Sequence, residues 1–136
     1  MNHGAPAFQW LLEYELHAAS RYRRFVSLLM ATSANGSGSG AEFLQNEVRA
    51  SDKVFDMGAY STVVMTETDL FGARSAAKRF ADLTNGDRRL YFAVGSFPGD
   101  GREPTEFAST VHRRLQAVAE DGCPGEGSVR DMNPPA

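Results

Sequence analysis

The sequence has a single cysteine, no strong excess of charge and no long hydrophobic run, and each absence excludes a class of protein. Cys123 stands alone among 136 residues, so no disulfide forms within the chain and the cytoplasm is the expected compartment. A net charge of −3 gives no electrostatic case for nucleic acid, because duplex binding needs clustered lysine and arginine. The longest apolar run, residues 25–31, is far short of the roughly 20 residues of a membrane span.

Metal ligands and activated nucleophiles are also scarce. His3, His17 and His112 have no ligand spacing between them and no cysteine beside them, which makes a zinc site improbable. Cys123 lies among glycine and proline after the last expected helix, without the structured, electropositive setting of a catalytic thiol. We therefore expect no metal, no cofactor and an exposed, unreactive cysteine.

What is present fits one compact domain. Hydrophobic residues make up 42% of the chain and charged residues 23%, both ordinary for a globular protein. Residues 7–121 carry the periodic patterns, whereas residues 1–6 have no signal-peptide character and residues 122–136 are rich in glycine, proline and charge. We predict a single domain over residues 7–121 with a flexible segment at either end.

Hydrophobic periodicity predicts an alternation of helices and strands. Helices are expected at about residues 7–23, 41–48, 69–84 and 104–119, and strands at 25–31, 54–57, 62–66 and 90–94. The third helix begins at a cap, Thr68 or Asp69, and its buried face would be Leu70, Ala73, Ala77, Phe80 and Leu83. Two strand–helix–strand crossovers flank a hairpin. The sequence therefore predicts an α+β, ferredoxin-like sandwich: an antiparallel or mixed sheet of about four to five strands with helices packed on it, plus an N-terminal helix.

A glycine-rich stretch follows the first expected strand. Gly36-x-Gly38-x-x-Ala41 opens a helix, where backbone amides can cradle phosphate. The dinucleotide-binding fingerprint also needs a parallel sheet and an acid after the next strand, and neither is expected here. We interpret this stretch as a flexible loop.

Four segments, in order and spacing, resemble the GGDEF domain of the diguanylate cyclase family. They are residues 14–30, 49–54, 63–79 and 94–101, and together they span most of residues 8–120. The resemblance implies the fold predicted above. It also locates the family's signature at a hairpin, where this chain has Gly58, Ala59, Tyr60, Ser61 and Thr62.

The departures from the family imply a degenerate domain that is not an enzyme. Cyclase chemistry uses divalent metal held by carboxylates. The family places one such aspartate near Thr32 and the next acid at the signature, where Tyr60 and Ser61 stand. The family's triphosphate-binding lysine corresponds to about Ala119.

The family's inhibitory site, which binds cyclic di-GMP, is the feature that the sequence retains. Arg49 and Asp52 match its Arg-x-x-Asp motif, and Arg79 falls where the family adds a second arginine. A guanidinium can fork onto phosphate or onto guanine, and a carboxylate can accept from guanine N–H groups. Arginine and aspartate three residues apart also commonly form a local salt bridge or cap. Both interpretations stay open from sequence.

Two functions follow from this resemblance. The first is a catalytically inactive regulatory module that acts through protein–protein contacts in bacterial signalling, with a homodimer among the arrangements it allows. The alternative is a cyclic di-GMP effector that uses Arg49, Asp52 and Arg79. Two surface features suit a partner: the basic cluster Arg21, Arg23 and Arg24, and Tyr60 at the hairpin. The simpler interpretations are a solvated helix end for the three arginines and a partly buried side chain for Tyr60.

Overall fold

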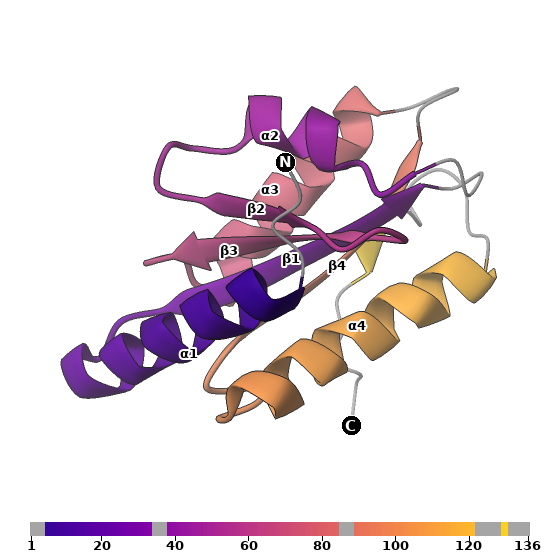
Figure 1. The fold of residues 1–136 in the computed structure, drawn as a ribbon. Coiled ribbons are helices and arrows are strands. Elements are labelled where there is room, and N and C mark those ends of the chain that lie inside the picture. Colours follow the sequence, from indigo (N-terminus) through magenta and orange to yellow (C-terminus); the bar gives the residue numbers. More distant parts are fainter. Residues whose placement is uncertain (1–4, 34–37, 85–88, 122–128, 131–136) are drawn as a thin grey trace.

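A computed structural model describes residues 5–33, 38–84, 89–121 and 129–130 (Figure 1). Its elements, in order, are α1 (Ala5–Tyr22), β1 (Val26–Ser33), α2 (Ala41–Glu47), β2 (Lys53–Asp56), β3 (Ser61–Thr66), α3 (Leu70–Leu83), β4 (Leu90–Phe97), α4 (Pro104–Asp121) and β5 (Val129–Arg130). Across the described residues, no helix combines the length and apolar character needed to cross a bilayer.

The strands form one sheet in the order β2-β3-β1-β4-β5. Strands β2, β3, β1 and β4 are antiparallel to their neighbours, which confirms the predicted α+β sandwich. The short β5 pairs in parallel with β4, Val129 opposite Phe92 and Arg130 opposite Ala93. These two residues differ from the structureless tail expected over residues 122–136, because the edge of β4 offers them unpaired backbone groups. The glycine at 36, the turn at 85–87, Cys123 and His3 lie outside the described residues.

Helices cover both faces of the sheet, α1 and α4 on one and α2 and α3 on the other (Figure 1). Side chains of β1 alternate between the two layers, since successive residues of a strand point to opposite faces. Leu28 and Met30 join the core under α1 and α4, whereas Leu29 and Ala31 join the core under α2 and α3. The sheet is therefore buried on both faces, which explains the almost uninterrupted apolar sequence of β1.

The helix faces largely follow the predicted periodicity. Helix α1 buries Phe8, Leu12, Leu16 and Ala19. Asp69 is the cap of α3, because its Oδ1 accepts a hydrogen bond from Gly72 N at 2.8 Å.

The prediction that Leu83 is buried in α3 is wrong. Its side chain is 56% exposed, whereas Thr84 is buried and donates from Oγ1 to Phe80 O at 3.0 Å. Thr84, not Leu83, continues the 3.6-residue stripe of Ala73, Ala77 and Phe80.

A buried ion pair joins α4 to the end of β4. The Arg114 guanidinium donates to Asp100 Oδ1 at 2.7 Å and to Val94 O at 3.0 Å, and Asp100 Oδ2 accepts from Ser96 N at 2.9 Å. Helix α4 runs close to the strand here, since a Cβ added to Gly95 would lie 2.6 Å from Val111 Cγ2. The pair therefore fixes α4 against the sheet and closes the predicted turn at residues 98–101.

Replacing Asp100 with alanine is expected to lower the free energy of unfolding by about 3 to 5 kcal/mol, because Arg114 keeps a buried charge without its partner. Urea denaturation measures this change. Asp82→Ala, at an exposed position of α3, is the control and should change stability by less than about 0.5 kcal/mol. Equal stability of the two variants would contradict a role for this ion pair.

Candidate functional site

The central strand β1 connects the two regions that the sequence analysis singled out. Its antiparallel register with β3 sets Ala31 opposite Ser61 and Val26 opposite Thr66. The end of β1, with Thr32, therefore reaches the β2–β3 hairpin. Its beginning, with Ser27, reaches the segment between β3 and α3, next to Arg49 and Asp52.

Backbone and hydroxyl hydrogen bonds hold the hairpin. Met57 N donates to Tyr60 O at 2.8 Å, and Gly58 adopts a φ of 95° that glycine tolerates best. Thr32 Oγ1 donates to Ala59 O at 2.8 Å. Ser61 Oγ, fully buried, donates to Ser39 O at 2.8 Å. The structure thus places Thr32 beside the hairpin, as the resemblance implies, with its hydroxyl already used inside the protein.

Tyr60 is half-buried at this hairpin, the second of the two interpretations considered for it. Its ring lies 4.4 Å from that of His112 on α4, centroid to centroid, with 30° between the ring planes. Burial raises the pKa of Tyr60 and lowers the pKa of His112. Both rings are therefore favoured in their neutral forms, and the pair joins the hairpin to α4 by packing.

Among the described side chains at the hairpin, Asp56 is the carboxylate, and its Oδ1 accepts a hydrogen bond from Gly58 N at 3.0 Å, whereas Thr32, Ser61 and Thr62 offer neutral oxygen atoms. Thr62 Oγ1 is buried without a hydrogen-bond partner among the described residues. Ala119, at the position where the resemblance implies a lysine, lies exposed on the last turns of α4. Chemically, this end of the sheet presents hydroxyl, backbone carbonyl and aromatic groups with the single carboxylate of Asp56, and the described residues hold no cluster of three or more potential metal ligands.

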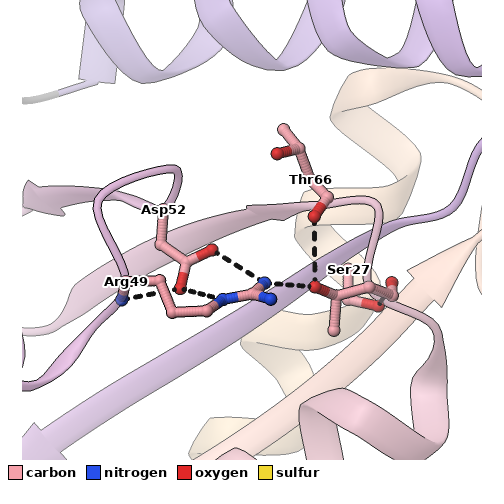
Figure 2. Close-up of polar contacts among 5 residues, drawn as sticks. Ser27, Arg49, Asp52 and Thr66 are labelled. Atoms are coloured by element: carbon pink, nitrogen blue, oxygen red, sulfur yellow. Dashed lines mark hydrogen bonds and ion pairs between the residues drawn. The ribbon is translucent and has the colours of Figure 1, made fainter.

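Arg49 and Asp52 form a local ion pair at the other end of β1 (Figure 2). The guanidinium reaches Asp52 Oδ1 from Nη2 at 3.3 Å and Asp52 Oδ2 from Nε at 3.4 Å, and Arg49 N donates to Asp52 Oδ2 at 3.2 Å. The Asp52 side chain is 1% exposed and that of Arg49 is 59% exposed. The salt-bridge interpretation is therefore correct for this structure, and it leaves much of the guanidinium facing solvent.

Thr68 is a partner of Arg49 that sequence reasoning missed. Arg49 Nη2 donates to Thr68 Oγ1 at 2.7 Å, and Thr68 Oγ1 donates to Thr66 O at 3.1 Å. Behind it, the buried Ser27 Oγ donates to Thr68 O at 2.6 Å. The sequence identified Thr68 only as a potential helix cap, since nothing in the chain links it to a residue 19 positions earlier.

The three predicted ligand residues line one cavity. Arg49, Asp52 and Arg79 surround a volume of about 370 Å³ together with Thr68 and Ser75. The Arg79 guanidinium lies over the ring of Phe80, 4.8 Å from its centroid, and the side chain is exposed. The fold thus brings together two arginines from α3 and the segment after α2 at a concave surface, an arrangement suited to an anion or a planar base.

Comparisons with known proteins identify the fold. No family model matches the sequence, and the search of curated proteins found no match. Solved GGDEF domains match the structure. A sensory box/GGDEF family protein from Caulobacter crescentus matches with a TM-score of 0.73 and 15% identity, over 87% of this chain and 93% of its own.

Two Pseudomonas aeruginosa domains agree with this match. The GGDEF domain of YfiN (also called TpbB) has a TM-score of 0.78 and 16% identity, over 96% of this chain and 90% of its own. The GGDEF domain of FimX has a TM-score of 0.78 and 11% identity, over 96% and 94% of the two chains. The chain therefore has the GGDEF fold that the resemblance implies.

The half-buried pair of Tyr60 and His112 predicts a pH-dependent stability. Because the pKa of His112 is lowered below 6.5, the unfolded chain binds a proton more readily than the folded chain. The contribution of His112 to stability is then fully present above the unfolded pKa of 6.5 and is lost as the pH falls through the lower pKa of the folded chain. His112→Phe keeps a ring against Tyr60 without titrating, so its melting temperature should fall less than that of the wild type between about pH 7 and pH 5. Equal slopes for the two proteins would contradict this assignment.

Proposed function

We propose that this domain is a catalytically inactive GGDEF-type module that acts through protein contacts in bacterial signalling. The hydrogen bond from Thr32 Oγ1 to Ala59 O carries the proposal. Thr32 occupies the position at which the family has its first metal-binding aspartate. The hydrogen bond ties this neutral side chain to the hairpin. Magnesium prefers anionic oxygen ligands, which a threonine engaged with a backbone carbonyl does not supply.

The neighbouring positions support the same conclusion. Ser61 donates its hydroxyl to Ser39 O, and Tyr60 packs its ring on His112. Both side chains are therefore committed to holding the hairpin against the rest of the protein. Removing one well-placed electrostatic group typically slows an enzyme by orders of magnitude, so loss of the acids at two positions abolishes practical turnover. A domain that keeps the GGDEF fold but does not catalyse the cyclase reaction would act by binding another molecule.

Incubation with radiolabelled GTP and magnesium tests this proposal. We expect no cyclic di-GMP above the level of a protein-free control, with an active diguanylate cyclase assayed in parallel. Any turnover that depends on protein concentration would overturn the assignment of Thr32 and Tyr60.

Cyclic di-GMP binding is a second candidate function, favoured by the cavity of Arg49, Asp52 and Arg79. A phosphate or guanine base there would meet the exposed part of the Arg49 guanidinium and the guanidinium of Arg79. Asp52 is buried and already paired, so it would hold Arg49 in place rather than contact the ligand alone. The hydrogen bond to Thr68 further fixes the orientation of the guanidinium.

Calorimetric titration with cyclic di-GMP separates the two functions. An effector would bind with a dissociation constant in the micromolar range, and Arg49→Ala and Arg79→Ala would each abolish the heat. Lys78→Ala, the exposed neighbour of Arg79 that does not line the cavity, is the matched control and would bind like the wild type. No heat at high protein concentration would favour the contact module.

A further inference from the structure

The outer face of α1 is an aromatic surface that the core does not use. We define it by Trp10, Tyr14, His17 and Arg21, all exposed. Trp10 is 67% and Tyr14 60% exposed, and their rings stack with centroids 5.9 Å apart and an interplanar angle of 8°. Helical geometry puts these four residues opposite the buried stripe of Phe8, Leu12, Leu16 and Ala19. One face of the helix therefore packs in the core, and the opposite, aromatic face is exposed to solvent.

A hollow runs beside this surface. The four residues of the α1 outer face, together with Phe97, Arg102 and Pro104, line a volume of about 740 Å³, twice that of the cavity at Arg49. Helices α1 and α4 lie next to each other on this side of the sheet (Figure 1). Large exposed tryptophan and tyrosine side chains beside a concave surface are typical of protein interfaces.

The spacing of the outer face is that of a helix that packs against another helix. Steps of four, three and four residues separate Trp10, Tyr14, His17 and Arg21, which is the alternation of apolar positions in a heptad. The aromatic side chains stand at the beginning of the stripe and the cation at its end. Two copies of this stripe laid antiparallel would therefore place the aromatic side chains of one copy against the cation of the other.

We propose that the α1 outer face binds the same face of a second copy of this chain, antiparallel, about a two-fold axis between Tyr14 and His17. This register sets Arg21 of each copy over the Trp10 indole of the other, a cation–π contact. It sets Tyr14 of each copy against His17 of the other, an aromatic pair. Each contact occurs twice, as a two-fold symmetric interface requires.

Charge selects the antiparallel arrangement. A parallel pair would put Arg21 against Arg21, which brings like charges together. The antiparallel register separates the two Arg21 side chains by 11 helix positions, about 16 Å at 1.5 Å per residue. It also leaves the exposed Glu13 within about one helical turn of the position that faces Arg21 of the other copy. This inference deepens the proposed function and rests on it, because it names the partner of the contact module.

The dimer is expected to be weak. Its contact is centred on about three turns of one helix, which lies at the small end of specific interfaces. We therefore expect a dissociation constant in the range of about 1 to 100 μM. Sedimentation velocity of the full chain over a concentration series that spans this range measures it. A sedimentation coefficient that stays that of a monomer throughout would overturn the proposal.

Trp10 is the sole tryptophan of the chain and reports directly on this face. Its emission should shift to shorter wavelength, and its quenching by acrylamide should decrease, as the protein concentration rises through the dissociation constant. Unchanged emission in a protein that does dimerise would place the interface elsewhere and would also overturn the proposal.

Substitutions test the residues. Arg21→Gln and Tyr14→Ala are each expected to weaken the dimer by roughly tenfold or more without loss of folding, because both positions are exposed. Phe71→Ala is the matched control. Phe71 is 74% exposed on α3, on the other side of the sheet, so its removal should leave the dissociation constant unchanged. An equal effect of Phe71→Ala would indicate non-specific association and would contradict the proposal.

Disulfide trapping tests the orientation. In a Cys123→Ser background, a mixture of Tyr14→Cys and His17→Cys proteins should form the mixed disulfide faster than either protein forms its own. Faster self-crosslinking of each variant would show a parallel pair and overturn the register. None of these measurements of dimerisation depends on nucleotide. Turnover of GTP would therefore disprove the proposed function and leave the dimer untouched. A protein that stays monomeric and does not turn over GTP would disprove the dimer and leave the proposed function untouched.

Discussion

Strand β1 is the constraint on which the rest of the structure depends. It is paired on both edges, to β3 and to β4, and it is covered on both faces by helices. A slip of one residue would exchange Leu28 and Met30 with Leu29 and Ala31 between the two cores, so the register is strongly specified. The same register carries Thr32 to the hairpin and Ser27 to the segment that holds Arg49. Both polar regions are therefore set by one buried strand.

The two ends of that strand differ in what they leave available to a ligand. At the hairpin, the hydroxyls of Thr32 and Ser61 are bonded to backbone carbonyls, and Tyr60 is packed on a histidine. At the other end, a buried carboxylate orients an exposed guanidinium beside a cavity. At the second end, charge and concavity coincide, an arrangement that suits the binding of a ligand.

Helices α1 and α4 show how the same fold creates contact surfaces. The Asp100–Arg114 ion pair, in which both side chains are buried, holds α4 on the sheet, and α1 packs beside α4 through its apolar face of Phe8, Leu12, Leu16 and Ala19. Because the inner face of α1 satisfies the core, its aromatic outer face is free to serve another molecule. A surface of this kind lies on a rigid element rather than on a loop, which lowers the entropic cost of binding.

Periodicity in the sequence determined the order of the elements, the inner face of α1 and the α+β class, because burial of apolar side chains dictates these locally. It failed at Leu83, where Thr84 continues the buried stripe. The resemblance pointed to Arg49, Asp52 and Arg79, which line one cavity, but two contacts between distant segments could not be predicted. Thr68 meets Arg49, and His112 meets Tyr60, only because the sheet and α4 bring distant segments together. Local sequence determines which face of each element is apolar, whereas only tertiary packing decides which polar groups meet, since hydrogen bonds between distant segments leave no periodic pattern in the chain.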